Sequence, residues 1–341
     1  MPYSRPSEIA FLSQRRERMA TEGGRKMSVF RTVVSATVAI LLMSASTTRA
    51  VPPDRPSRTA FSTCNYRAVA ALHPDPKLRN PDGLATRLCP EGRLPHEYER
   101  AKEMMERNPE ANAGYFFVNA RTRYIDEALA RAVTEGATQV VVLGAGYDSR
   151  AYRFHDANPK VVFFEVDLPA TLRAKQEALE RAFGSVPGHV RFAPIDFDRQ
   201  TLDAVLAGVG YDKGAKTFFI LEGVAMYVSL EGVGATLKFM STHSAPGSLV
   251  VYDYILRGVV DGDSASLYGA RPQASGAARV GEPFVSGWTP QEAAEFAARH
   301  GLELMEDVGP DALTKRYLLG SDGRPDGKMN EYQRIILARV R

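Results

Sequence analysis

Five short apolar segments, separated by stretches with helical character, constrain the fold of this chain more than any other sequence feature. Their apolar residues are consecutive rather than alternating, which is typical of strands buried on both faces of a parallel sheet. Between them lie three segments that favour helices: Ala170–Phe183, Thr201–Gly208 and Leu230–Ser241. This alternation predicts an α/β domain with a doubly wound sheet. The apolar segments are Gln139–Leu143, Val161–Val166, Val190–Ile195, Thr217–Leu221 and Ser248–Tyr252.

The sequence on either side of these segments has a different character. Residues 57–132 are expected to be mostly helical and to cover the sheet domain. After the fifth strand, Thr289 and Glu292 form a capping-box pattern around Pro290, and two more strands are expected at Leu302–Val308 and Arg334–Val340. Between the fifth strand and this capping-box pattern, residues 257–287 are rich in Gly, Ser and Ala and are expected to form a lid or a loop. The predicted domain therefore covers residues 57–341, with its core at 139–341.

Residues 1–56 are expected to be an extension of this domain. A basic segment is followed by the uncharged stretch Val33–Ala45 and then by Thr48-Arg49-Ala50, which together resemble a secretory signal. The apolar stretch is shorter than the roughly 20 residues that a membrane span needs. Three interpretations stay open: a cleaved signal, a retained membrane anchor, and an extension without consequence. Residues 51–58 contain three prolines and are expected to form a linker.

Composition and charge limit the classes of partner. The chain has 43 basic and 40 acidic residues and a formal net charge of +3, so no nucleic-acid partner is expected. The two cysteines, Cys64 and Cys89, cannot form a structural metal site on their own, and no metal is expected. The favoured interpretation is two free thiols, with a disulfide as the alternative for an exported protein. The oligomeric state is not predicted.

The segment Val140–Arg153, VVVLGAGYDSRAYR, indicates a ligand site. A strand runs directly into Gly144-Ala145-Gly146, and two glycines at this spacing allow a sharp turn and a close approach to a ligand. The third glycine of a dinucleotide fingerprint is missing, because position 149 is Ser, and the phosphate-binding GxxxxGK[ST] pattern is absent. An adenosine ligand without a pyrophosphate fits better, and S-adenosylmethionine (SAM) is such a ligand.

Acidic residues follow the next two strands. Asp167 ends the second strand, about 20 residues after the glycines, where a carboxylate accepts hydrogen bonds from ribose hydroxyls. Glu165 is the competing candidate for this role. Asp196, followed by Phe197, ends the third strand and is placed to contact the edge of an adenine ring.

Three segments, LGAGYDSRAYR, FFEVDLP and ILEGVAMYV, resemble the leucine carboxyl methyltransferase-like family of SAM-dependent methyltransferases, and particularly its actinobacterial branch. The resemblance covers about residues 57–340. It implies a class I SAM-dependent methyltransferase fold: a Rossmann-like, mostly parallel sheet of seven strands with a helical N-terminal cover. The family's protein-phosphatase tail-binding surface is not recognisable here, so a leucine carboxylate substrate is not implied.

The resemblance also implies roles for individual residues. It assigns Arg121 to the carboxylate of the methionyl group, Glu222 to the region of the sulfonium, and Tyr227 to the site of methyl transfer; Glu222 and Tyr227 are the candidate catalytic residues. Arg123 is the alternative to Arg121 for this role. If Arg121 binds no ligand, it is expected to form an ion pair on the helix surface with its neighbours Asp126 or Glu127. The remaining cofactor-binding residues that it implies are Gly144, Gly146, Asp167, Asp196 and Phe197.

The predicted function is methyl transfer from SAM to a carboxylate or hydroxyl of a small molecule. A carboxylate acceptor needs no base, whereas a hydroxyl acceptor needs one, and Tyr227 or Asp253 is expected to orient either acceptor. The alternatives are an NAD(P)-dependent oxidoreductase and a non-catalytic SAM-binding module. Because SAM is made in the cytosol, a cytoplasmic location is favoured despite the signal-like segment 27–50, and a membrane would be a partner only if that segment were a retained anchor.

Overall fold

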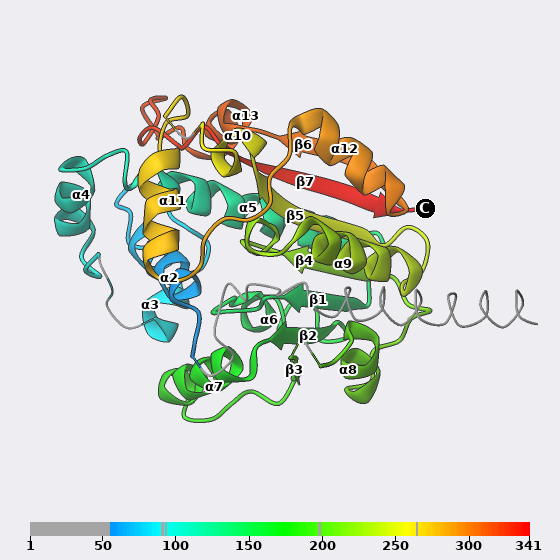
Figure 1. The fold of residues 1–341 in the computed structure, drawn as a ribbon. Helices are drawn as coiled ribbons and strands as arrows, with labels where there is room; N and C mark the ends of the chain where they lie inside the picture. The colour runs from blue at the N-terminus through cyan, green and yellow to red at the C-terminus, as the bar shows by residue number, and fades with distance from the viewer. Residues whose placement is uncertain (1–54, 90–91, 93, 197–198, 264) are drawn as a thin grey trace, which may run out of the picture. The chain divides into compact units, whose positions relative to one another are not determined.

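The computed structural model describes residues 55–341 except 90–91, 93, 197–198 and 264. Its sheet has seven strands in the order β3-β2-β1-β4-β5-β7-β6, with the first five parallel and β7 antiparallel to both of its neighbours (Figure 1). This is the predicted seven-stranded, mostly parallel sheet. The strands are β1 Gln139–Leu143, β2 Val162–Asp167, β3 Val190–Pro194, β4 Thr217–Leu221, β5 Leu249–Ile255, β6 Leu302–Val308 and β7 Gln333–Val340.

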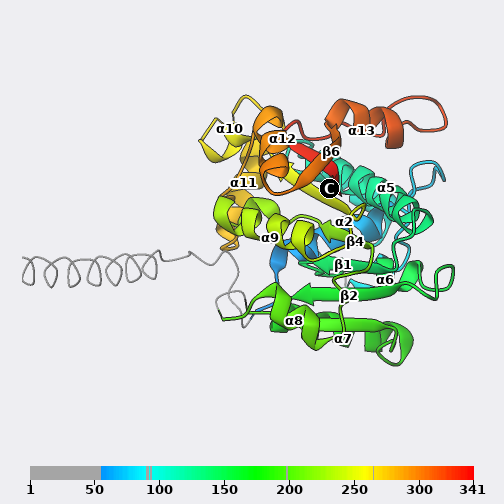
Figure 2. The ribbon, with the colours of Figure 1, turned by 90° about the vertical axis from the view of Figure 1, so that its right-hand side faces the viewer.

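Helices cover both faces of the sheet (Figure 2). One buried cluster joins the strands to α8 (Leu202–Gly208), α9 (Leu230–Thr242) and α12 (Pro290–Arg299). A second cluster joins the opposite face to α5 (Ala113–Thr134) and α13 (Pro310–Tyr317). Strands β1 and β4 are buried along their whole length, as their continuous apolar sequence requires.

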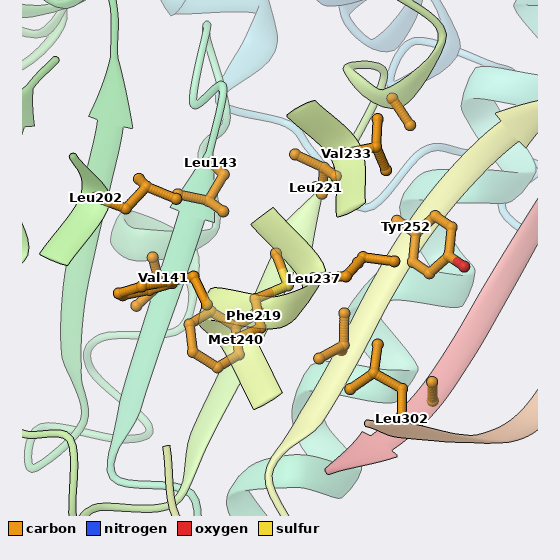
Figure 3. Close-up of a cluster of buried hydrophobic side chains, with 14 of the residues drawn as sticks. Val141, Leu143, Leu202, Phe219, Leu221, Val233, Leu237, Met240, Tyr252 and Leu302 are labelled. Carbon is orange, nitrogen blue, oxygen red and sulfur yellow. The ribbon is translucent and has the colours of Figure 1, made fainter. Parts of the chain in front are cut away.

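The packing of the first cluster shows why the central strands are apolar after their first residue. Val141, Leu143, Phe219 and Leu221 point to the same face of the sheet, where Leu237 of α9 packs against them (Figure 3). The residues between them in β1 and β4 belong to the cluster on the other face. Because each of these apolar residues enters one of the two cores, a charge at any of these positions would be buried without solvent.

The region before the sheet is helical, as the sequence predicts. It contains α2 (Arg58–Ala70), α3 (Ala85–Leu88), α4 (Tyr98–Glu106) and α5. Ser57 caps α2, because its hydroxyl accepts a hydrogen bond from the Ala60 amide. At the other end of the domain, Thr289 and Glu292 form the predicted capping box of α12.

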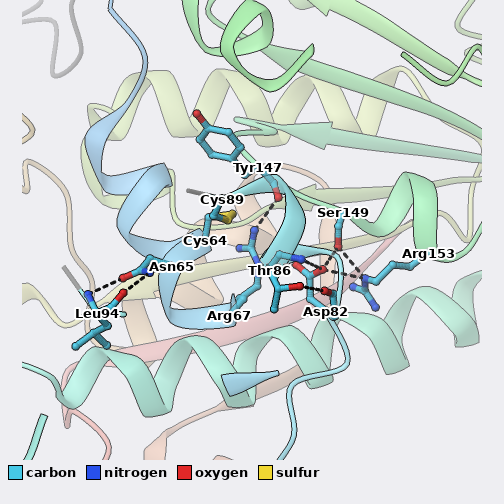
Figure 4. Close-up of a disulfide and its surroundings, with 12 residues drawn as sticks. Cys64, Asn65, Arg67, Asp82, Thr86, Cys89, Leu94, Tyr147, Ser149 and Arg153 are labelled. Carbon is cyan, nitrogen blue, oxygen red and sulfur yellow. Dashed lines mark hydrogen bonds and ion pairs between the residues drawn. A yellow bond between two sulfur atoms is a disulfide. The ribbon is translucent and has the colours of Figure 1, made fainter. Parts of the chain in front are cut away.

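The prediction of free cysteines is wrong. Cys64 of α2 and Cys89, which follows α3, form a disulfide, with their Cα atoms 6.0 Å apart (Figure 4). The packing of α2 against α3 brings the two residues within the range that a disulfide can bridge, and sequence spacing alone could not show this. The disulfide is buried with Ala68 and Ala85, and Tyr147 of the glycine turn packs against it.

The segment from 257 to 287 is not a plain loop. It contains α10 (Arg257–Val260) and α11 (Ala270–Arg279), which pack with Tyr332 and the half-buried Tyr227. The remaining helices are the short α6 (Arg150–Arg153) after the glycine turn, the longer α7 (Pro169–Phe183) after β2 and the 3-10 turn η1 (Ala225–Tyr227) after β4. No helix among the described residues is long and apolar enough to span a membrane. The signal-like stretch lies outside the described residues.

Candidate functional site

The glycine turn after β1 depends on conformations that other residues rarely adopt. Gly144 and Gly146 have φ values of +70° and +44°. A Cβ atom at Gly144 would overlap the side chain of Val224, and one at Gly146 would lie 3.1 Å from the Cβ of Ala60. Both glycines are therefore needed for the turn and for close packing, in addition to the predicted approach of a ligand.

Asp167 holds this turn in place. One of its carboxylate oxygens accepts a hydrogen bond from the Gly146 amide at 2.7 Å, and the other accepts one from the Leu168 amide at 2.6 Å. Burial raises the pKa of Asp167, and the two amides offset part of that rise. Each carboxylate oxygen keeps a further lone pair, so the group retains the capacity to accept from two ribose hydroxyls.

Glu165, the competitor of Asp167, has a different partner. It is fully buried and lies 2.6 Å from the ammonium group of Lys175 in α7, which is also fully buried. Burial raises the pKa of Glu165 to about 7, although Lys175 opposes the rise. A carboxylate committed to a buried cation is poorly placed to bind ribose, so Asp167 remains the better candidate.

Arg121 lies in the middle of α5 and is buried at the edge where β1, β4 and β5 end. One of its terminal nitrogens donates to Asp253 of β5 at 2.7 Å, and the other lies 3.0 Å from Glu222. The interpretation as a surface ion pair is therefore wrong for Arg121, because α5 turns this side chain toward the sheet. Its Nε–H is buried and donates to no acceptor among the described residues.

Glu222 is held between two guanidinium groups. Its second oxygen accepts from Arg150 at 2.7 Å, while Arg121 lies at the first. Burial alone would raise the pKa of Glu222, but Arg121 and Arg150 outweigh burial and hold it well below the usual range. Glu222 is therefore an anion at neutral pH, and its lowered pKa makes it a weak base that is poorly suited to take a proton from an acceptor.

Asp253 does not face an open site as an acceptor-orienting group would. Both of its oxygens are engaged, one with Arg121 and the other with the Gly223 amide at 2.6 Å. Burial raises its pKa, and Arg121 opposes the rise. Asp253 thus fixes Arg121 and the turn after β4, and the expectation that it orients an acceptor is not supported by this geometry.

Tyr227 lies beside the segment that contains α11. Its ring is 5.5 Å from that of Phe284, and its hydroxyl is hydrogen-bonded to Thr59. Burial, with the nearby charge of Glu282, raises the pKa of Tyr227, so the hydroxyl stays protonated. The carboxylate of Glu282 in turn accepts from the Arg58 amide at 3.0 Å and from the hydroxyls of Ser57 and Thr59.

The predicted adenine contact is described only in part. Asp196 follows β3, its amide donates to the side chain of Gln200 at 3.0 Å, and its carboxylate lies 3.9 Å from Arg199. Phe197 lies outside the described residues. Arg123, the alternative to Arg121, donates to the carbonyl of Arg79 and does not reach the turns at the strand ends.

Sequence reasoning missed several charged residues around Arg121 and Glu222. Asp148 and Arg150 stand within the quoted glycine motif, and Asp126 lies on α5 with an oxygen 2.7 Å from the Nε of Arg150. The sequence gives no signal for their burial, because Asp148 and Arg150 flank Ser149 and Asp126 is followed by Glu127. Among the described residues, no group of three or more His, Cys, Asp or Glu side chains could hold a metal ion.

Comparisons with known proteins identify the family of this chain. The family model of leucine carboxyl methyltransferase matches residues 60–241. The Streptomyces coelicolor protein named "Putative S-adenosyl-L-methionine-dependent methyltransferase SCO7813" is 31% identical over 257 residues, which cover 74% of this chain and 85% of that protein. The similarly named Bacillus subtilis protein YktD is 34% identical over 194 residues, 57% of this chain. That match spans 63% of the Bacillus protein, less than two thirds of its length.

The fold has a relative among solved structures. The crystal structure of a DUF574 family protein from Streptomyces avermitilis superposes with a TM-score of 0.52 at 17% sequence identity. The superposition covers 82% of this chain and 97% of that one. At this level of identity the comparison supports the fold and no residue role.

Proposed function

This chain belongs to the leucine carboxyl methyltransferase family of SAM-dependent methyltransferases, and on that premise we propose that it transfers a methyl group from SAM to an oxygen atom of a small molecule. The observation that carries the proposal is the convergence of Arg121, Glu222 and Asp167 on the turns that follow β1, β2 and β4. In open α/β sheets, ligands bind beyond the carboxyl ends of the strands. SAM would supply an activated methyl group on a sulfonium.

The residues present fit SAM in two respects. The unpaired Nε–H of Arg121 is a buried donor suited to the carboxylate of the methionyl group, and Asp167 can accept from the ribose hydroxyls while it holds the Gly146 amide. We further propose that Asp196, with Phe197, contacts the adenine, and that Glu222 lies near the positively charged end of the ligand. The anionic state of Glu222 suits that position.

The acceptor that these groups favour is one that needs no base. Glu222 stays ionised between two arginines, and Tyr227 stays protonated, so neither takes a proton at neutral pH. A carboxylate, or a hydroxyl acidic enough to ionise on its own, is already a nucleophile. The chain's contribution is then to bind the acceptor in line with the donor and to exclude water, with Tyr227 donating a hydrogen bond to it.

We also propose that residues 57–341 form the methyltransferase domain and that residues 257–287 close over its site. The contacts of Glu282 with the start of α2, which bring that segment next to Tyr227, support this arrangement.

Two observations bear on the compartment in which the protein works. SAM is made in the cytosol, which favours a cytosolic domain, whereas a buried disulfide is more usual in oxidising compartments. Mass spectrometry of the native N-terminus separates the two. A first residue at position 51 would indicate export, and a retained Met1 or Met27 would support the cytosolic proposal.

The proposed activity is tested with radiolabelled SAM and two matched panels of small molecules, carboxylic acids and phenols of similar size. We expect label transfer to acids or acidic phenols, with no transfer when Tyr227 and Glu222 are replaced together. Calorimetric titration with SAM and with NADH is run beside it. Binding of NADH without binding of SAM would overturn the proposal.

A further inference from the structure

A continuous chain of buried ion pairs extends from the turn after β4 to α2. It starts at Asp253 and Arg121, passes through Glu222 to Arg150, and continues through Asp126 to Arg153. Asp148 branches from Arg150, and Asp82 joins Arg153 to Arg67 at 3.7 and 2.8 Å (Figure 4). We call these nine side chains the ion-pair network. Its members come from α2, α5, α6, β5 and the turns around them.

The network is both buried and unequal in charge. It contains four arginines and five carboxylates, so the carboxylates exceed the arginines by one. Every member has a side-chain exposure of 12% or less. A net charge removed from solvent is unfavourable unless something compensates it. Arg121 Nε and Arg150 Nη2 are both buried and donate to no acceptor among the described residues, so the network still has unused hydrogen-bonding capacity.

The proposed donor and its product differ in charge by one unit. SAM carries a sulfonium, an ammonium and a carboxylate and has a net charge of +1, whereas S-adenosylhomocysteine has lost the sulfonium charge and is neutral overall. Lys175 of α7 and Glu165 of β2 lie nearby and pair with each other, so their charges cancel when both are ionised. Asp167 and Glu282 lie outside the network and are acidic, so neither offsets its excess of negative charge.

We propose that the excess negative charge of the ion-pair network selects the cationic methyl donor over its neutral product. The network then favours binding before transfer and release after it, without any movement of the chain. Within the network, Asp148 is a positioning residue, because it acts through Arg150 on Glu222 and is not itself expected to touch the donor. This inference rests on the proposed function, since it takes SAM as the donor.

The test is calorimetry at fixed ionic strength with three ligands: SAM, S-adenosylhomocysteine, and sinefungin, in which a protonated amine replaces the methylsulfonium. The quantity compared is the ratio of the product's Kd to the donor's Kd. Asp148→Asn keeps the shape of the side chain and removes one carboxylate, so we expect this ratio to fall about tenfold. Because sinefungin is cationic like SAM, its Kd should rise as the Kd of SAM does. Arg153→Gln removes one arginine and so increases the excess of negative charge in the network, and we expect the ratio to rise.

The matched control is Asp203→Asn, which removes an exposed carboxylate on α8 that is paired with Lys213. It should leave the ratio unchanged. A purely structural role of the network predicts that Asp148→Asn weakens all three ligands equally, and that result, or an unchanged ratio in both variants, would overturn the inference. If Asp148→Asn does not fold, Arg153→Gln and Glu222→Gln test the inference in its place: the ratio should rise in the first variant and fall in the second. Failure of the wild-type protein to bind SAM at all would instead contradict the proposed function.

Discussion

The two sides of the candidate site are built in different ways. On the side proposed for the ribose, one carboxylate, Asp167, is held by two backbone amides from its own turn and the glycine turn. On the side proposed for the amino-acid group, Arg121 and Glu222 belong to a buried network contributed by segments from Arg67 to Asp253. The first side depends on local backbone geometry, and the second depends on the whole fold.

This difference explains which features of the site can be predicted from the sequence. A glycine turn and an acid at the end of the next strand stand close together in the chain, so their spacing carries the information. Ion pairs between residues such as Arg121 and Asp253, which are 132 positions apart, form only after α5 packs on the sheet. The predictions below test whether the two sides respond to mutation as differently as their construction implies.

The largest effect is expected at Arg121. Its replacement by Ala leaves Glu222 with one partner fewer and Asp253 buried without its cation, so the free energy of unfolding should fall by about 3–5 kcal/mol. Urea denaturation measures this, with Arg121→Lys, which keeps the charge, as the control. A loss under 1 kcal/mol would mean that the network is not a coupled structural unit.

On the other side of the site, the buried pair of Glu165 and Lys175 should make stability depend on pH. Burial raises the pKa of Glu165 to about 7 in the folded state, above its unfolded value of about 4.3. Its stabilising contribution is therefore complete below the unfolded value and is lost as pH rises through 7, a decrease of about 4 kcal/mol at most.

This decrease is measured as the difference in unfolding free energy between the wild type and Glu165→Gln, determined from pH 4.5 to 8. As pH rises, the unfolding free energy of the wild type should fall relative to that of Glu165→Gln. Glu135→Gln, at an exposed ion pair with Arg131, is the matched control. Parallel curves for wild type and Glu165→Gln would show that the pKa of Glu165 is not raised.

A smaller effect is expected in the glycine turn. Gly144→Ala should reduce the free energy of unfolding by about 2 kcal/mol, because φ is +70° and the new Cβ meets Val224. The double variant with Val224→Ala should recover the steric part of this loss and keep the backbone part. Thermal unfolding of both variants measures the two parts, and no recovery in the double variant would assign the whole cost to the backbone.

The sheet itself was predictable because its signal is local. Strands with an unbroken apolar run, such as Gln139–Leu143 and Thr217–Leu221, are buried on both faces, and the structure places both where the sequence predicts. The strand ends shifted at β2, β3, β5 and β7 by one to three residues, since strand ends depend on pairing with neighbours.

The remaining features needed the tertiary structure. The Cys64–Cys89 disulfide depends on how α2 packs on α3, and the partners of Arg121 depend on which face of α5 meets the sheet. Glu282 stands in a stretch without periodicity. It contacts Thr59 at the start of α2, which lies 223 positions earlier in the chain. Such contacts leave no trace in sequence spacing.

The central claim is that the methyl donor lies across the turns after β1, β2 and β4, with its ribose at Asp167. Calorimetry of SAM and adenosine with the wild type and with Asp167→Ala tests it most directly, with circular dichroism to verify that the variant is folded. The account predicts that Asp167→Ala weakens both ligands by a hundredfold or more, because both carry the ribose. An unchanged affinity for SAM in the folded variant would contradict it.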